Sequence, residues 1–395
     1  MKQLRTVSLF SGCGGLDLGF HHEGFVNVGA YDINPIVIET FRQNINNAAY
    51  VADLGREMVD IPTNVDVLLA GSPCQGFSLA GKRDIHDPRN NLLVRAGEYA
   101  LSVRPRVFLA ENVPGALSGE LKRYWASLDK LLVSNGYRTR TIEIEATQVG
   151  AAQTRRRVFL IAWTGKRDLN ISIPEVANEP TLRDALKNLP RDAEHAQHTT
   201  LKSESTDIQI AECIKPGQKL SNVRRGPNTV HTWHIPGVFG RTTKAERELL
   251  DGLIGLRRRL RTRLKGDADP VSIDAIREHA GREADRLVER LIKKGYLRMI
   301  NGSIDLANTF NGKYRRLAWD RPSYTVDTYF GNPRYFLHPT EHRGFSVREA
   351  ARIQGFPDSF TFHGTMRENF QMIGNAVSPK VSRYLAGVIR TLLVN

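Results

Sequence analysis

The sequence predicts an α/β protein built on a Rossmann-like, mostly parallel sheet, with a second, smaller domain inserted into the chain. Three observations predict this fold. Short apolar runs alternate with helical patterns over roughly the first 165 residues, a glycine-rich turn follows the first run, and polar side chains follow the later ones. With 395 residues, of which 41% are hydrophobic, the chain can form one large domain and a smaller one.

The first predicted strand covers residues 6–10 and leads into the turn SGCGG, after which Leu16, Leu18 and Phe20 indicate a helix. Further strands are predicted at residues 26–31, 66–70, 107–110, 137–145 and 158–163. Apolar residues repeat at helical spacing from Val381 to Leu392, which predicts a final helix packed back on the sheet. Because ligands bind beyond the carboxyl ends of parallel strands, we expect the functional site there.

The balance of charge favours a polyanionic partner. There are 56 Lys and Arg residues against 42 Asp and Glu, a net charge of +14, which is typical of nucleic-acid-binding proteins. The three cysteines, Cys13, Cys74 and Cys213, are too few for a disulfide framework or a zinc site with paired ligands. We therefore expect a reducing cytoplasm, no metal, and, without a signal-like or membrane-spanning apolar run, no export and no membrane.

A nucleoside site is predicted at the first glycine-rich turn. Gly12, Gly14 and Gly15 let the backbone approach a ligand closely, and Asp32 at the end of the second strand can accept hydrogen bonds from ribose hydroxyls. The spacing G-x-G-G lacks the third glycine of the dinucleotide pattern, so a methyl-donor nucleoside is favoured over a nicotinamide cofactor. A plain strand-to-helix turn is the alternative.

Three further segments carry reactive groups. GSPCQGFS at residues 71–78 places Cys74 in a polar, glycine-flanked loop, where a thiol is less typical of a core residue than of a nucleophile. Glu111 follows the fourth predicted strand, at the same sheet edge. Gln153, Arg155 and Arg157 alternate, so they lie on one face of an extended segment.

Together, and in this order, these segments resemble the DNA cytosine-5 methyltransferase family. The resemblance rests on SLFSGCGGLDLGF at 8–20, GSPCQGFSLAGKR at 71–83, ENV at 111–113, QTRRR at 153–157, REAARIQGFPDSF at 348–360 and QMIGNAVSP at 371–379. The family usually has Pro where Ala152 stands and often Glu where Asp32 stands. Neither departure removes a reacting group.

The resemblance implies a Rossmann-like fold of the type that depends on S-adenosylmethionine, with a target recognition domain inserted. Cys74 is the implied nucleophile, Glu111 the acid, Arg157 the group that holds the exocyclic oxygen of cytosine, and Arg155 a brace for the loop or for a phosphate. The implied cofactor residues are Phe10, Ser11, Gly12, Gly14, Gly15, Leu16, Asp32, Ile33, Asp53, Leu54, Pro73, Asn375 and Val377. The implied substrate contacts are Gln75, Ser78, Lys82, Arg83 and Gln153.

The domain boundaries are predicted from where the motifs stop. Residues 1–170 with 345–395 form the catalytic and cofactor-binding domain, and residues 171–344 the target recognition domain. The run of basic residues from Arg257 to Lys265 lies beside a leucine face, and it either contacts DNA or is a solvated helix face. Residues 271–307 resemble a winged-helix unit, which reads DNA or braces the domain.

The expected partner is double-stranded DNA, together with a cognate restriction endonuclease that acts on the same site. We expect a prokaryotic, cytoplasmic and nucleoid-associated enzyme. A tRNA cytosine-5 methyltransferase of the same family is the main alternative, against which the long central segment argues. An inactive methyltransferase fold that only binds nucleic acid is disfavoured because Cys74 and Glu111 are both present.

Overall fold

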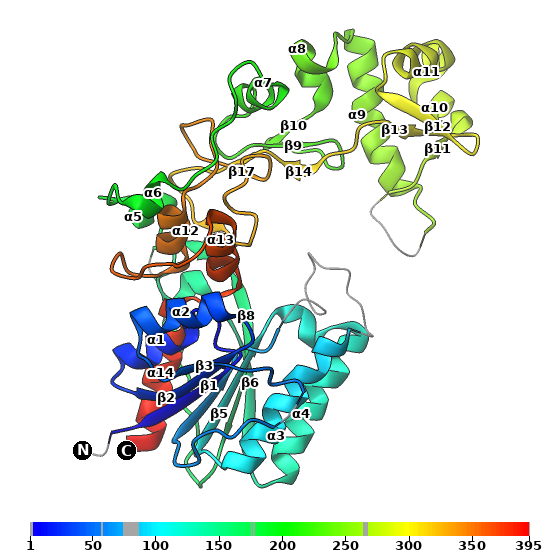
Figure 1. The fold of residues 1–395 in the computed structure, drawn as a ribbon. Helices are drawn as coiled ribbons and strands as arrows, with labels where there is room; N and C mark the ends of the chain where they lie inside the picture. The colour runs from blue at the N-terminus through cyan, green and yellow to red at the C-terminus, as the bar shows by residue number, and fades with distance from the viewer. Residues whose placement is uncertain are drawn as a thin grey trace. The chain divides into compact units, whose positions relative to one another are not determined.

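A seven-stranded sheet forms the core of the first part of the chain (Figure 1), in a computed structural model that describes residues 3–56, 58–73, 87–174, 176, 178–263 and 268–394. In spatial order the strands are β3 (Ala49–Val51), β2 (Val26–Asp32), β1 (Arg5–Leu9), β4 (Val67–Ala70), β5 (Val107–Asn112), β8 (Arg156–Trp163) and β6 (Arg138–Glu145). Only β8 runs antiparallel to its neighbours. The six predicted strands are confirmed, whereas the short strand β3 was not predicted.

The parallel register brings the loops after neighbouring strands to one edge. Leu9 pairs with Ala70, and Ala70 pairs with Ala110, so the chain leaves β1, β4 and β5 at the same level. The segments that contain the predicted reactive groups begin there.

Alternate residues of the strands face two layers of helices (Figure 1). Leu68 and Ala70 pack in one apolar cluster with α3 (Leu92–Val103) and α4 (Lys122–Ser134). Val67 and Leu69 pack in another with α1 (Gly15–His22) and α14 (Pro379–Val394). The predicted return of the last helix to the sheet is confirmed.

Shorter elements complete this unit. The helices are α2 (Pro35–Asn44), α5 (Leu182–Leu186), α6 (Ala193–Ala196), α12 (Val347–Gln354) and α13 (Met366–Asn375). The 3-10 turns are η1 (Pro88–Asn91), η2 (Pro114–Leu117), η3 (Gly119–Leu121) and η4 (Ala146–Val149), and β7 (Gln153–Thr154) pairs in parallel with β16 (Ser323–Tyr324).

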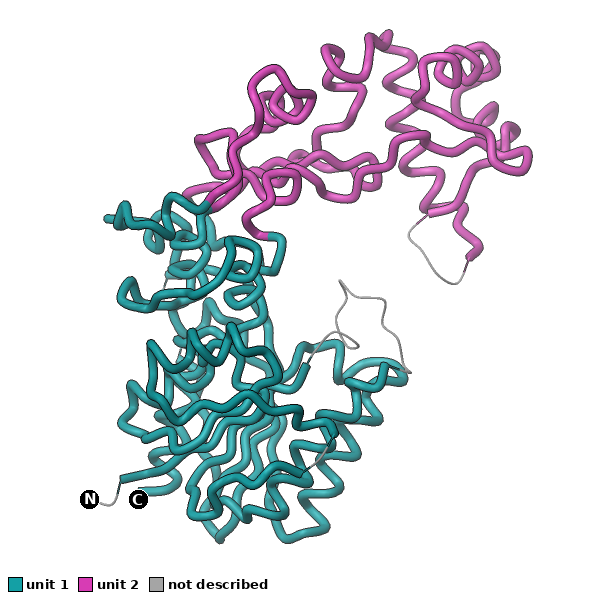
Figure 2. The backbone as a smooth tube through the Cα atoms, in the orientation of Figure 1, with its two compact units in different colours: residues 1–197, 320–329, 346–395 teal, residues 198–319, 330–345 magenta. Residues whose placement is uncertain are grey.

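The chain divides into two units whose boundaries differ from those predicted (Figure 2). Unit 1 contains residues 1–197, 320–329 and 346–395, and unit 2 contains residues 198–319 and 330–345. Residues 171–197 belong to unit 1 because their side chains pack on it, and residues 320–329 return to pair with β7. The motif-based boundary at residue 170 is therefore too early.

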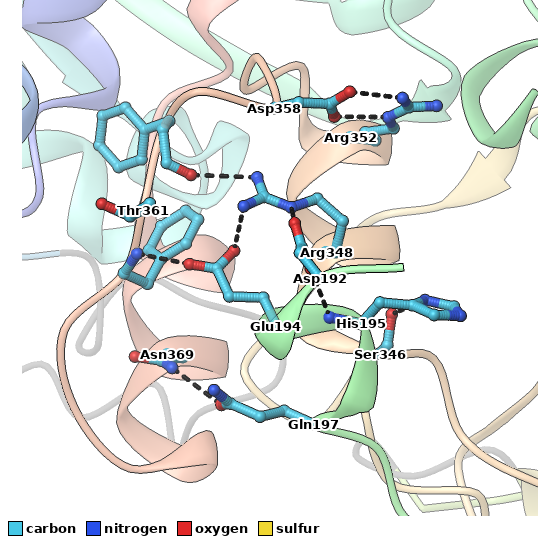
Figure 3. A network of polar contacts seen from close by, with 12 residues as sticks. Asp192, Glu194, His195, Gln197, Ser346, Arg348, Arg352, Asp358, Thr361 and Asn369 are labelled. Carbon is cyan, nitrogen blue, oxygen red and sulfur yellow. Dashed lines mark hydrogen bonds and ion pairs between the residues drawn. The ribbon is translucent and has the colours of Figure 1, made fainter. Parts of the chain in front are cut away.

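A buried network around Arg348 of α12 fixes the last part of that segment (Figure 3). The guanidinium of Arg348 lies 2.8 Å from a carboxylate oxygen of Asp192 and 2.8 Å from one of Glu194, and it donates to the carbonyl of Phe360 at 3.0 Å. Glu194 also accepts from the main-chain N–H of Phe362 at 2.7 Å, and its burial raises its pKa. Removing one partner from such a buried network leaves a charge without compensation, so the segment is held firmly on α12.

Unit 2 is built from short helices and small sheets. The helices are α7 (Thr206–Glu212), α8 (Pro236–Phe239), α9 (Lys244–Arg259), α10 (Ile273–Ala280) and α11 (Ala284–Lys293), with 3-10 turns η5 (Thr232–His234) and η6 (Gly281–Glu283). The strands are β9 (Lys219–Ser221), β10 (Thr229–Val230), β11 (Val271–Ser272), β12 (Leu297–Ile300), β13 (Ser303–Leu306), β14 (Asn311–Lys313), β15 (Arg315–Arg316) and β17 (Phe336–Leu337). Among the described residues of both units, we find no helix with the length and apolar character needed to cross a bilayer.

The basic run of unit 2 differs from its predicted arrangement. α9 ends at Arg259, and Leu260, the next residue, is 44% exposed. Arg257 is buried, with its Nε 2.7 Å from Asp305, and Arg263 pairs with Asp269. Lys265 lies outside the described residues. Within residues 257–263 the run is not one continuous basic surface, because Arg257 is buried in an ion pair and the charge of Arg263 is paired with Asp269.

Candidate active site

A cavity of about 500 Å³ opens at the carboxyl ends of β1, β2, β4 and β5, all within unit 1. The predicted cofactor residues that line it are Phe10, Ser11, Gly12, Gly15, Leu16, Asp32, Ile33, Asp53, Leu54, Pro73, Asn375 and Val377. Glu111 and Arg157 line the same cavity. The space is of the size of a small-molecule site and mixes apolar walls with a few charged groups.

Gly14 is the predicted cofactor residue that does not line this cavity. It has φ +91°, and a Cβ at this position would lie 2.3 Å from Cδ1 of Ile45 and 2.9 Å from Cδ2 of Phe41. Glycine is required because α1 packs closely on α2 at this point, and the predicted cofactor contact of Gly14 stays a prediction. Gly15 has a different neighbour: a Cβ there would lie 2.5 Å from the carbonyl oxygen of Val377, which brings the first loop against the C-terminal motif.

The carboxylate of Asp32 is positioned by the first turn. It accepts hydrogen bonds from the main-chain N–H groups of Gly12 and Asn34, each at 3.0 Å, and burial raises its pKa despite these bonds. Gly12 has φ +53°, a conformation that glycine adopts without strain. The turn therefore orients an acceptor at the cavity wall.

Glu111 and Arg157 form a buried pair. Nε of Arg157 lies 2.8 Å from Oε1 of Glu111, and the two side chains are 14% and 9% exposed. Burial raises the pKa of Glu111, and this effect outweighs the opposing effect of the charges of Arg157 and Arg155. A carboxyl with a raised pKa beside a fixed cation can hold or release a proton at a reacting base.

Arg155 has a bracing role in this structure. Its guanidinium donates to the carbonyl oxygens of Val326 at 2.8 Å and of Gly374 and Ala376 at 2.9 Å, and the side chain is 2% exposed. Of the two predicted roles, the geometry supports the brace and not the phosphate contact. Arg155 is a positioning residue, since it lies between β7 and β8 and holds the end of α13 through Gly374 and Ala376.

Gln153 is held by contacts within unit 1. Its side chain is fully buried, its amide nitrogen donates to the side chain of Gln354 and to the carbonyl of Ile353, and its amide oxygen accepts from the N–H of Val326 at 3.0 Å. These contacts give Gln153 a structural role, and its predicted substrate contact stays a prediction. The alternation itself is confirmed, because Gln153 and Arg155 are buried while Thr154 and Arg156 between and beside them are exposed.

The predicted nucleophile Cys74 lies outside the described residues, as do Gln75, Ser78, Lys82 and Arg83. The chain reaches this segment through Gly71, whose N–H donates to the carbonyl of Leu9 at 3.1 Å, and through Pro73, which lines the cavity. Cys74 therefore follows a cavity-lining residue directly in the chain.

Several cavity residues were not predicted. Ser72 is 3% exposed, and its hydroxyl finds no hydrogen-bond partner among the described residues, although it lines the cavity. Glu368, Gln371 and Met372 line it from α13. Gln371 and Met372 lie inside the recognised motif QMIGNAVSP, so their position in that motif was a usable signal. Within the described ranges, no cluster of three or more His, Cys, Asp or Glu could hold a metal ion.

Fold and cavity together define an α/β enzyme with a nucleoside-sized pocket next to an acid–arginine pair. The sequence matches the C-5 cytosine-specific DNA methylase family over residues 4–391. The chain belongs to this family, and it transfers a methyl group to carbon 5 of cytosine in DNA.

Similar proteins agree with this assignment. The Type II methyltransferase M.AgeI of Thalassovita gelatinovora is 31% identical, with 99% of this chain and 100% of that protein covered. The Type II methyltransferase M.HgiCII of Herpetosiphon aurantiacus is 30% identical, with 96% and 95% covered. These relatives favour DNA over tRNA as the substrate.

Two solved structures are similar over the full length of both chains. One is a protein described as a DNA modification methyltransferase encoded within a prophage (E. coli), at 25% identity and a TM-score of 0.60. The other is the Dnmt2 methyltransferase of S. pombe, at 18% identity and a TM-score of 0.55, which is evidence for the fold alone.

Proposed function

We propose that the cavity binds S-adenosylmethionine and that Cys74 forms a covalent adduct with the target cytosine. The observation that carries the proposal is the buried pair of Glu111 and Arg157, which lines the same cavity as the glycine turn and Asp32. The residues fit the cofactor. Asp32 offers a carboxylate for ribose hydroxyls, Gly12 leaves the wall open where a side chain would stand, and Phe10 and Leu54 supply apolar surface for a purine.

Carbon 5 of cytosine is a poor nucleophile, and the proposed role of Cys74 is to change that. Its thiolate adds to carbon 6, which makes carbon 5 enamine-like and moves electron density toward nitrogen 3 and the exocyclic oxygen. Glu111 donates its proton, or a hydrogen bond, to nitrogen 3, and Arg157 holds the exocyclic oxygen. The raised pKa of Glu111 suits this role, because the carboxyl keeps its proton closer to neutral pH.

When bound, S-adenosylmethionine supplies the electrophilic methyl group. After transfer, carbon 5 carries both the methyl group and a proton. Loss of that proton to a base, with the electron pair expelling the Cys74 thiolate from carbon 6, restores the aromatic ring. Nitrogen 3 gives its proton back to Glu111 in the same step, so the enzyme regains its starting form.

The proposed substrate is double-stranded DNA. A cytosine stacked in a duplex cannot reach a thiol and a carboxyl on opposite sides of its ring, so the base is flipped out, at an energetic cost of a few kcal/mol. Unit 2 carries out target recognition in this proposal. The names of the Type II relatives fit a cognate restriction endonuclease, and an enzyme acting on prokaryotic DNA works in the cytoplasm at the nucleoid.

The experiment uses duplex DNA that contains 5-fluorocytosine at the target. Fluorine cannot leave as a proton does, so the adduct persists and the complex migrates as a covalent band on a denaturing gel. We expect the band with the parent enzyme and with Cys213→Ser, a matched control in which the exposed cysteine of unit 2 is changed. Cys74→Ser should give no band, and a band with that variant would remove Cys74 from its assigned role.

A further inference from the structure

Residues 272–306 of unit 2 form a helix-turn-helix followed by a hairpin. α10 and α11 are joined by the three residues of η6, and this turn begins with Gly281 at φ +70°. The strands pair in the order β11-β13-β12, and Asn301 and Gly302 have φ +48° and +75°, as a type I′ hairpin turn requires. In a helix-turn-helix, the second helix enters the major groove of DNA.

The two faces of α11 differ in character. Leu287, Val288 and Leu291 are buried in the same apolar cluster as residues of α9. Arg286, Glu289 and Lys293 follow at positions i, i+3 and i+7, so they share the opposite face, and all three are exposed. We call these three residues the outer face of α11.

Other basic residues nearby are already engaged by buried carboxylates. Arg290 and Lys294 lie 3.5 and 2.8 Å from Glu246, whose side chain is 1% exposed, and Arg257 pairs with Asp305. On the outer face, the ion pair of Arg286 with a described residue is a 3.6 Å contact with exposed Glu283, and the Arg286 side chain is 71% exposed, so its charge stays accessible to solvent. An accessible pair of cations on a helix can contact a polyanion at little desolvation cost.

We propose that the outer face of α11 enters the major groove of duplex DNA within or beside the methylated sequence. Arg286 and Lys293 contact phosphates or guanine acceptors, and Glu289 accepts a hydrogen bond from the exocyclic amine of a cytosine. The inference rests on the proposed function of unit 2 and assigns its groove-reading element. It replaces the basic run as the principal DNA contact, because that run is split by the ion pairs of Arg257 and Arg263.

The test compares two variants of the full-length enzyme with the same change in charge. They are Arg286→Gln/Lys293→Gln on the outer face and Arg258→Gln/Arg259→Gln at the exposed end of α9. Affinity for a duplex carrying the methylated site is measured by fluorescence anisotropy at several salt concentrations. Each lost phosphate contact reduces the slope of log affinity against log salt by about 0.9.

We expect the outer-face variant to flatten the slope by about 1–2 and the α9 variant to leave it near that of the parent. The opposite order of effects, or two unchanged slopes, would overturn the proposal. Glu289→Gln is expected to relax discrimination at one base pair by roughly 5- to 100-fold, read by methylating a library in which each position is randomised. Unchanged preference at every position would exclude base reading by this face.

A second readout separates this inference from the proposed function. Methyl transfer at saturating DNA is measured for all variants, since their substitutions lie outside the cavity. If the outer-face variant keeps this rate but loses affinity, both proposals stand. If the outer-face variant binds DNA with the affinity and salt slope of the parent and still methylates it, only the proposed role of α11 is wrong. If the parent enzyme methylates no DNA, the proposed function itself is wrong.

Discussion

Two buried carboxyls of unit 1 have raised pKa values for the same reason and yet have different neighbours. Glu111 faces the guanidinium of Arg157 in a cavity, whereas Asp17 of α1 accepts hydrogen bonds from the neutral side chains of Ser8 at 3.0 Å and Asn27 at 2.9 Å. A cation keeps the ionised form of Glu111 accessible, so that group can exchange a proton. Burial without a cation raises the pKa of Asp17 to about 7.

Glu111→Gln should retain cofactor binding and lower single-turnover methylation by roughly 10²–10⁴-fold, because the amide cannot transfer a proton. In the pH profile of the methylation rate, formation of the Cys74 thiolate makes the rate of the parent rise with pH. A fall of the rate at higher pH therefore reports loss of the proton from Glu111. That fall should vanish in the variant. Glu120→Gln, at an exposed position in η3, is the control, and a parent-like rate in Glu111→Gln would refute the acid role.

Asp17→Asn should stabilise the protein more at pH 8 than at pH 5. The carboxyl has a pKa of ~3.9 in the unfolded chain, so between about pH 4 and 7 only the folded state keeps the proton and stability falls as pH rises. An asparagine oxygen can still accept from Asn27, and its amide nitrogen can donate to the Ser8 hydroxyl, so both contacts persist without this penalty. Urea unfolding should show a gain about 1–3 kcal/mol larger at pH 8.

Asp60→Asn, at an exposed carboxyl, serves as the control for Asp17→Asn and should show no such pH-dependent gain. An equal gain from Asp17→Asn at both pH values would mean that Asp17 is ionised in the folded state throughout this range.

Three polar residues whose structural partners the sequence did not reveal share one property. Gln153 and Arg155 are fixed by partners about 170 to 220 positions away in the chain, and Arg257 is fixed by Asp305 on another element. Their polar groups are saturated by contacts that exist only after folding. Residue type and spacing predicted where these residues lie in the chain and in the fold. They did not predict which groups their side chains would bind.

At the scale of elements, the strands and the loops after them were predictable because apolar runs and glycine turns are local signals. β3 was missed because three residues with two exposed side chains give no periodic pattern. The role of Gly14 was missed for a different reason. Its neighbours Ile45 and Phe41 belong to α2 or follow it, so the need for glycine there comes from the packing of two helices.

Gly14→Ala should destabilise unit 1 by roughly 1–3 kcal/mol. The alanine backbone would have to keep the left-handed conformation of Gly14, and the added Cβ would overlap Ile45 and Phe41. Gly387→Ala in α14 is a matched control of opposite sign. An added Cβ there meets no heavy atom of the described chain within 4 Å, so removing a helix glycine should stabilise by about 0.5–1 kcal/mol. Thermal denaturation of both variants tests this, and equal effects would contradict it.

For the whole molecule, the boundaries predict which exchanges of sequence the protein accepts. Replacing residues 198–319 and 330–345 with the equivalents from a relative of different specificity should move methylation to the donor's sequence. The chemistry should stay, because Glu111 and Arg157 lie in unit 1 and Cys74 lies within its sequence range.

An exchange of residues 171–344 is the comparison. With a donor that lacks acidic residues at the positions of Asp192 and Glu194, Arg348 is left buried without a carboxylate partner, and the melting temperature should fall by several degrees relative to the first chimera. Bisulfite sequencing of methylated plasmid and thermal denaturation give the two readouts. Equal stability of both chimeras would place the boundary nearer residue 170.

The short return of residues 320–329 to unit 1 has a consequence for how such enzymes can diverge. Its contacts with the QTRRR segment run largely through main-chain atoms: Ser323 donates its N–H to Ala152, and Val326 offers its N–H to Gln153 and its carbonyl to Arg155. The main chain of residues 320–329 can make these bonds whatever its side chains are, provided that positions 323 and 326 are not proline. A single recombination event that spans both parts of unit 2 would also replace residues 320–329, which lie between them, and unit 1 would keep these bonds. A gene can therefore acquire a new sequence specificity in one genetic step.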